Sequence, residues 1–118
     1  MNFSGTVEDQ IAIRSLLEAY GDAVAMRDAK AWGDTWAEDA VWELLGQQHN
    51  GRDAIVATWQ AMMDGFEFTG FSMGVGNIAV DGDRAKLRVH VSEELWGKDG
   101  SKTHVRGRYD DDLIRTAD

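Results

Sequence analysis

The chain has 118 residues, and its 12 Lys and Arg side chains stand against 21 Asp and Glu, which gives a net charge of −9 at neutral pH. This length predicts a single domain over residues 1–118, and the absence of Cys excludes a disulfide scaffold. An acidic chain without a cluster of Lys and Arg is not expected to bind nucleic acid or an anionic membrane. Since it shows neither a bilayer-spanning apolar run nor a signal sequence, we expect a cytoplasmic location.

Hydrophobic periodicity predicts three helices in the first part of the chain. The first covers residues 7–27 and is capped near Thr6, because its apolar residues recur at helical spacing. A short second helix follows Asp28, which is its expected N-cap. The third begins within residues 50–53, shows the strongest helical spacing and ends near Gly65.

The other segments alternate between apolar and polar residues, which is typical of strands. A short strand is predicted over residues 40–45, where Gly46 stops it. One face of the strand after the third helix consists of Phe71, Met73, Val75 and Asn77. Beyond a turn at residues 81–82, the next strand buries Leu87, Val89 and Val91. After a second turn at residues 97–100, the last strand presents one face made of Thr103, Val105, Gly107, Tyr109, Asp111 and Leu113.

Helices followed by an antiparallel meander predict the α+β class. This order, together with the motifs Ala37-Glu38-Asp39-Ala40 and Asn50-Gly51-Arg52 and the closing segment 107–113, resembles a SnoaL-like domain of the nuclear transport factor two-like superfamily. The resemblance covers essentially the whole chain. It implies a cone-shaped fold, in which a strongly curved antiparallel sheet wraps around three N-terminal helices and leaves a pocket open at one end. Relatives continue with one more strand, so we expect the closing strand to be missing and the edge at 40–45 to be unpaired.

The resemblance also supplies catalytic positions to test. Scytalone dehydratase and hexachlorocyclohexane dehydrochlorinase use an Asp on the first helix and a His on the strand after the third helix. The matching positions are Ala25 and Met73. Neither side chain can move a proton, so chemistry by that dyad is not expected.

Ketosteroid isomerase is a second template, with a Tyr and a protonated Asp around the substrate oxyanion and an Asp as general base. Its Tyr matches Tyr20 and its oxyanion-hole Asp matches Asp111. The base position is Leu44, so the resemblance implies that the donors are kept and the base is lost. Glu93 is the candidate replacement because it shares the apolar face of its strand.

A pocket for a small apolar or aromatic molecule is expected from the aromatic and Met residues. Trp32 and Trp36 share one face of the predicted second helix. Ordinary core packing is the competing explanation for these residues, as it is for Tyr20. The predicted pocket residues are Trp36, Trp42, Leu44, Trp59, Met63, Met73, Asn77, Val91 and Tyr109.

Other polar groups have simpler interpretations. The three His residues, His49, His90 and His104, are expected at the surface rather than in a metal site. The run Asp110-Asp111-Asp112 alternates across a strand, so its carboxylates cannot converge on a cation. The polar strand face is a candidate homodimer surface, as in many relatives.

Two functions therefore stay open. The first is a cofactor-free isomerase or dehydratase acting on a largely apolar carbonyl or hydroxyl compound, with Tyr20 and Asp111 polarising an oxygen and Glu93 as base. The alternative is a non-catalytic ligand-binding or homo-oligomeric assembly module. Neither requires a cofactor or a metal.

Overall fold

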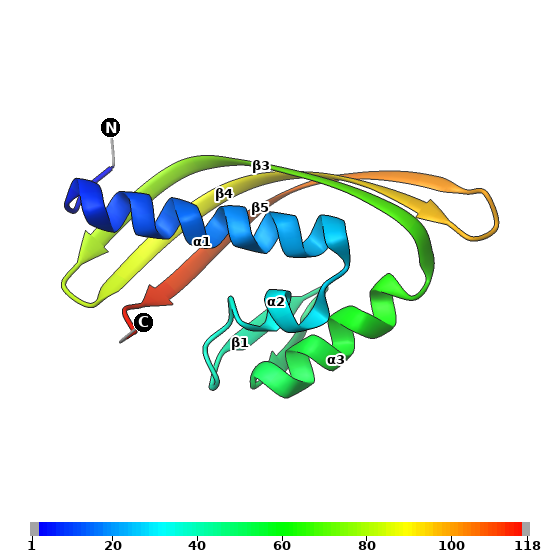
Figure 1. Cartoon of the computed structure of the whole chain (residues 1–118), viewed down its shortest axis with the longest axis horizontal. Helices are drawn as coiled ribbons and strands as arrows, with labels where there is room; N and C mark the ends of the chain where they lie inside the picture. Colours follow the sequence, from blue (N-terminus) through cyan, green and yellow to red (C-terminus); the bar gives the residue numbers. More distant parts are fainter. Residues whose placement is uncertain (1–2, 117–118) are drawn as a thin grey trace.

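Three helices and five strands make up residues 3–116, which are the residues described by the structure, a computed structural model (Figure 1). The helices are α1 (Val7–Met26), α2 (Ala29–Gly33) and α3 (Arg52–Met63). The strands are β1 (Val41–Leu44), β2 (Gln47–Asn50), β3 (Phe66–Asp81), β4 (Arg84–Gly97) and β5 (Lys102–Ile114). This content confirms the α+β class.

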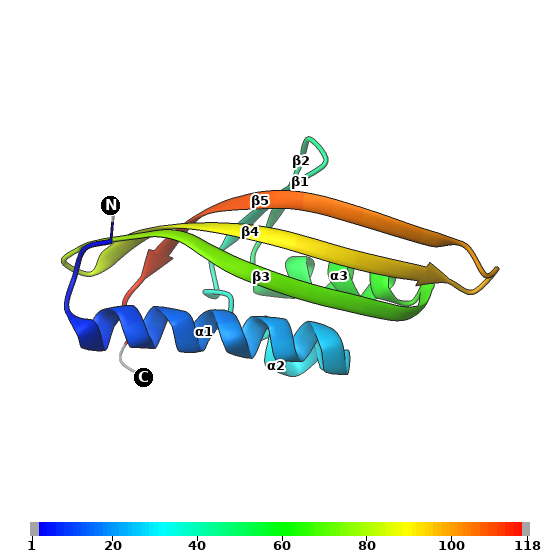
Figure 2. The ribbon, with the colours of Figure 1, turned by 90° about the horizontal axis from the view of Figure 1, so that it is seen from above.

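The three long strands form one antiparallel sheet in the order β3-β4-β5. The sheet bends along its length into an arch, and α1 lies under its concave face (Figure 1). Seen from above, α1 runs alongside β3, whereas the hairpin of β1 and β2 projects beyond β5 (Figure 2). Within the described residues, β1 and β2 pair only with each other. The sheet is therefore curved and wrapped but does not close into a barrel.

Side-chain caps explain where the first two helices begin. The Thr6 hydroxyl accepts a hydrogen bond from the Asp9 backbone N–H at 3.0 Å, and the Asp28 carboxylate accepts one from Ala31 at 3.0 Å. Arg27 follows α1 in the left-handed conformation, with φ of 54°, and ends it. Both predicted N-caps are confirmed.

Three expectations about local structure are wrong. Residues Gln47–Asn50 form strand β2, which has no apolar alternation to indicate it. Helix α2 ends at Gly33, so Trp36 lies beyond it rather than on its face. A bulge between Val75 and Asn77 shifts the register, so that Asn77 is opposite Arg88 and no longer shares the face of Val75.

The core has two parts. One part, between the helices and the β1–β2 hairpin, is built around Trp32, Ile55 and Trp59. The other lies between α1 and the long sheet and contains Leu17, Ile78, Leu87, Val89 and Val91. Burial of Leu87, Val89 and Val91 confirms the alternation predicted for that strand. No helix in the described residues is long and apolar enough to cross a membrane.

Candidate functional site

Tyr20 of α1 and Tyr109 of β5 meet on the concave side of the sheet. Their rings are perpendicular, with centroids 6.4 Å apart. Burial raises the pKa of Tyr109 to about 12 and that of Tyr20 well above its ordinary value. Tyr109 also raises the pKa of Tyr20, whereas Tyr20 lowers that of Tyr109, so the two hydroxyls interact.

Glu93 stands on the same concave face. It is half-buried on β4, and burial raises its pKa. Its charge also raises the pKa of both tyrosines, so the carboxylate lies within electrostatic reach of the two hydroxyls. Gly107 of β5 lies between Tyr109 and the position opposite Glu93. It has no side chain and is exposed. The space beside the three groups is thus open.

Asp111 lies on the other side of Tyr109. It is opposite Leu87 in the β4–β5 register, while Glu93 is opposite Val105. This separates the two carboxyl residues by six strand positions, or about 20 Å along the sheet. Burial, then repulsion from Asp110 and Asp112, raises the pKa of Asp111 to about 6. Tyr20 and Tyr109 are in ring contact, and Glu93 lies on the same face four strand positions from the residue opposite Tyr109. Asp111 is apart from Glu93.

The tryptophans predicted for the pocket gather at the other core. Trp32, which is completely buried, stacks on Trp59 with centroids 4.6 Å apart and touches the rings of Trp36 and Trp42 at 5.5 Å each. Tyr20 joins this aromatic cluster through Trp32, at 5.7 Å. The buried Trp32 indole N–H has no hydrogen-bond partner among the described residues. Trp32 nevertheless lowers the pKa of Tyr20, against the larger rise that burial causes.

Among the other predicted pocket residues, Trp59, Met63 and Val91 are buried, and Leu44 and Met73 are half-buried. Ala25 is exposed on α1, while Met73 reaches Gly21 of the same helix: a Cβ at Gly21 would lie 2.9 Å from the Met73 methyl. Neither Ala25 nor Met73 is ionisable. His104 bonds Ser92 at 2.8 Å, His49 bonds Thr58 at 3.2 Å, and no cluster of metal-ligating side chains occurs in residues 3–116.

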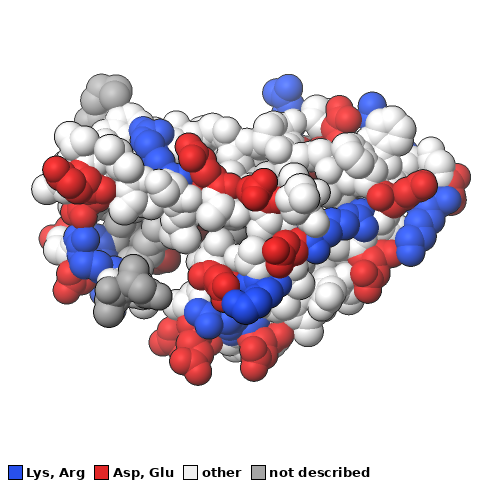
Figure 3. Space-filling model, in the orientation of Figure 1, with Lys and Arg blue, Asp and Glu red and all other residues white. Residues whose placement is uncertain are grey.

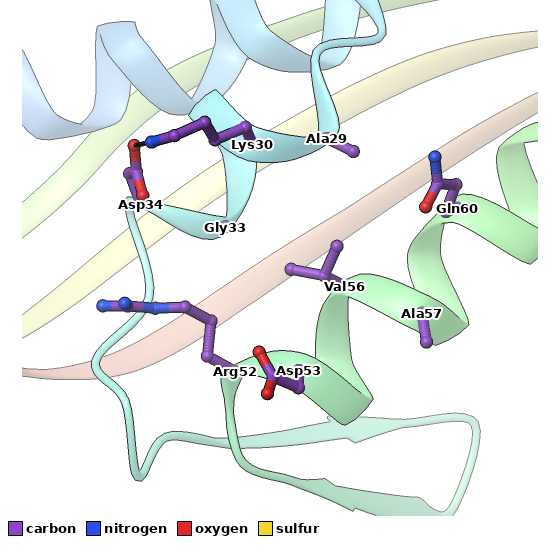
Figure 4. Close-up of a pocket in the computed structure, with 9 residues that line it drawn as sticks. All are labelled: Ala29, Lys30, Gly33, Asp34, Arg52, Asp53, Val56, Ala57 and Gln60. Atoms are coloured by element: carbon purple, nitrogen blue, oxygen red, sulfur yellow. Dashed lines mark hydrogen bonds and ion pairs between the residues drawn. The ribbon is translucent and has the colours of Figure 1, made fainter.

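A shallow cavity of about 400 Å³ lies between α2 and α3 (Figure 4). Three of its four charged residues are already engaged: Lys30 pairs with Asp34 at 3.0 Å, and Arg52 donates two hydrogen bonds to the Trp36 carbonyl at 2.6 and 2.9 Å. A larger cavity of about 530 Å³ lies under the first half of α1. Neither cavity is lined by Tyr20, Tyr109, Glu93 or Asp111.

Sequence reasoning placed Tyr109 only among the pocket residues and missed its pairing with Tyr20. It also missed the cavity under α1, which depends on Arg115 bonding Asp9 across 106 positions of sequence. The signal that could have indicated the tyrosine pairing was composition, since the chain has two Tyr and both occupy inward positions. No short-range pattern could have indicated the cavity under α1.

Side chains of both charges are interspersed on the surface. On the face shown in Figure 3, Asp and Glu side chains are scattered with Lys and Arg between them, and no continuous positive patch forms. The outer face of the long sheet carries cross-strand pairs instead, with Lys86 at 2.7 Å from Asp112 and Arg88 at 3.4 Å from Asp110.

Comparison with solved structures finds the same fold. A protein from Novosphingobium aromaticivorans that is named as an aromatic ring hydroxylase is 30% identical, with a TM-score of 0.84 over 97% of this chain and 83% of that one. A protein from the same organism named as a scytalone dehydratase is 20% identical, with a TM-score of 0.81 over 94% and 76% of the two chains. A ketosteroid isomerase-like protein from Erwinia carotovora atroseptica is 19% identical, with a TM-score of 0.83 over 95% and 88%.

No curated protein matches the chain. The family model of the SnoaL-like domain matches residues 5–118, which is nearly the whole sequence. Its match agrees with the open, curved sheet and with the dehydratase-named and isomerase-like neighbours. The chain therefore belongs to the SnoaL-like domain family, within the fold of the nuclear transport factor two-like proteins.

Proposed function

We propose that the protein binds a small, largely apolar molecule carrying a carbonyl or hydroxyl group and transfers a proton on it without a cofactor. The observation that carries this proposal is the contact between the rings of Tyr20 and Tyr109 on the concave face that also holds Glu93, where burial raises all three pKa values. Hydrogen-bond donors and a carboxylate in such surroundings are the groups that enolisation requires.

Each group has a defined task in this scheme. Tyr109 donates its hydrogen bond to the carbonyl oxygen of the ligand, and the ring of Tyr20 packs against Tyr109 and holds it in place. The Glu93 carboxylate removes a proton from the carbon next to the carbonyl, so that the C–H electron pair forms the enolate double bond and the carbonyl pair moves to oxygen. Return of the proton from Glu93 to a different carbon completes an isomerisation.

Asp111 has a different task from the one expected by resemblance. Its separation from Glu93 by six strand positions makes it unsuited to share one reacting carbonyl with the base. It acts on Tyr109, whose pKa its charge raises. We place it as a neighbour that keeps Tyr109 protonated.

Proton exchange at carbon tests the proposal directly. The probe is 3-cyclohexenone in D₂O, where exchange is followed by mass spectrometry and conversion to the conjugated isomer by ultraviolet absorbance. Glu93→Gln and Tyr109→Phe should each lower the rate at least tenfold. Glu94→Gln is the matched control, since Glu94 pairs with Lys102 at 3.7 Å and is opposite His104 rather than a residue of the concave face. Exchange that survives Glu93→Gln unchanged would contradict the proposal.

The alternative is a binding module without turnover, and the non-ionisable Ala25 and Met73 favour it. It predicts saturable binding of such ketones with no exchange above the uncatalysed rate.

We also keep the proposal that two copies pair through the outer sheet face, where Phe68 and Trp96 are 57% and 40% exposed. Sedimentation of the chain, with Trp96→Lys as the disrupting variant, tests that pairing.

A further inference from the structure

The cavity under the first half of α1 is separate from the proton-transfer cluster and is built differently. It has a volume of about 530 Å³, within the range of small-molecule sites. Apolar side chains from four elements line it: Ile13 and Leu16 from α1, Val80 from β3, Ala85 from β4 and Leu113 from β5. Convergence of so many elements on one space is what a ligand site needs.

The charged residues around this cavity satisfy one another. Arg115 binds the Asp9 carboxylate through two nitrogens, at 2.8 and 3.1 Å, and binds Asp83 through Nε at 3.0 Å. It also donates to the Gly82 carbonyl at 3.0 Å. All three nitrogens of the guanidinium are thus engaged, and Asp9 and Asp83 share one cation.

Arg84 also borders the cavity, but strand alternation places its side chain with Lys86 and Arg88 on the outer face. The wall therefore offers apolar area and no charge that needs a partner. A charged ligand would lose its hydration there without gaining a counter-ion.

We propose that this cavity binds a small, uncharged, apolar molecule of roughly the size of an eight-carbon chain. The ligand fills the space between Ile13, Leu16 and Leu113, and the Asp9–Arg115–Asp83 cluster closes the end of the cavity. Binding here is independent of Tyr20, Tyr109 and Glu93, none of which lines it.

Calorimetry with 1-octanol, octanoate and octylammonium tests both the site and its selectivity. We expect 1-octanol to bind at least tenfold more tightly than either charged compound of the same length. Ser15→Trp should weaken 1-octanol binding at least tenfold, because Ser15 lines the opening and is exposed. Ala19→Trp is the matched control one turn further along α1, exposed and away from the cavity, and should leave binding within twofold.

Amide NMR shifts keep the test decisive if Ser15→Trp does not fold. On addition of 1-octanol to the unaltered chain, the largest shifts should fall at Ile13, Leu16 and Leu113, and Tyr20→Phe should not change them. Absence of binding, equal affinity for the charged compounds, equal loss in both Trp variants, or shifts centred on Tyr109 would each overturn the proposal.

Discussion

Tyr20 of α1 packs its ring against that of Tyr109 of β5, with the two rings at 74° and 6.4 Å between centroids. This contact joins the aromatic cluster of the helices to the concave face of the sheet, since Tyr20 also touches Trp32 at 5.7 Å.

The interaction between these two phenols gives the first prediction. Because these are the two tyrosines of the chain, each Phe variant leaves a single phenol to titrate. Tyr20→Phe should raise the pKa of Tyr109 further, since Tyr20 lowers it. Tyr109→Phe should lower the pKa of Tyr20, which Tyr109 raises. Tyrosinate absorbance against pH measures both.

Alkaline stability should follow the same groups. A phenol whose pKa is higher in the folded chain keeps its proton there while the unfolded chain loses it, so stability falls as pH rises through the interval from about 10 to about 12. In either Phe variant the free energy of unfolding, measured by urea titration, should fall less steeply with pH over this interval. If the pKa of each remaining tyrosine moved in the opposite direction to the one stated, the described interaction between the two phenols would be wrong.

Asp111 gives the second prediction. Its pKa of about 6 in the folded chain exceeds the ordinary 3.8, so the folded state binds more protons in between and loses stability as pH rises through that window. The full shift corresponds to about 3 kcal/mol, which solvent at this half-buried residue reduces to about 1–2 kcal/mol.

Asp111→Asn should therefore raise the free energy of unfolding by that amount at pH 8 and by almost nothing at about pH 3, below both pKa values. Urea denaturation at several pH values measures the difference from the unaltered chain. Glu67→Gln is the control, because Glu67 is exposed on β3 and should show no such dependence. A gain that is the same at both pH values would place Asp111 in water rather than in the partly buried position described.

Most elements of the fold could be predicted, because caps and periodicity are local properties. Thr6 and Asp28 indicate the starts of two helices, and the alternation of Leu87, Val89 and Val91 indicates a half-buried strand. Strand β2 could not be predicted because its residues, Gln47–Asn50, are polar, and what holds it is its pairing with β1. Local patterns carry no information about such pairing.

The site was predictable only in its residue types. Inward-facing Tyr20, Glu93 and Asp111 could be found by strand and helix period, but their mutual distances depend on the β4–β5 register and on where α1 lies along the arch. The bulge at Val75 and Asn77 moved a predicted pocket residue off the face for a similar reason, since one extra residue changes the register of the strand beyond it.

Close packing of α2 on α3 gives the third prediction. A Cβ on Gly33 would lie 2.8 Å from Cγ2 of Val56, so Gly33→Ala should destabilise the chain by about 1–3 kcal/mol. In the double variant Gly33→Ala/Val56→Ala the clash is gone, and the two changes should cost less together than their sum, by about 1–2 kcal/mol. Gly74→Ala is the control, since no atom lies within 4 Å of its Cβ position, and it should stay within about 0.5 kcal/mol. Additive losses in the cycle would mean that the helices do not approach so closely.

The last prediction separates packing from chemistry in the aromatic cluster. Trp32 is 0% exposed and contacts the rings of Tyr20, Trp36, Trp42 and Trp59. Trp32→Ala should lower the free energy of unfolding by about 3–5 kcal/mol, because it leaves a cavity that four rings cannot close. Trp96→Ala, at 40% exposure on the outer face, should cost about 1 kcal/mol or less. If Trp32→Ala is stable but Tyr20 then titrates near its ordinary pKa, Trp32 serves to exclude water from the Tyr20 hydroxyl rather than to hold the helices together.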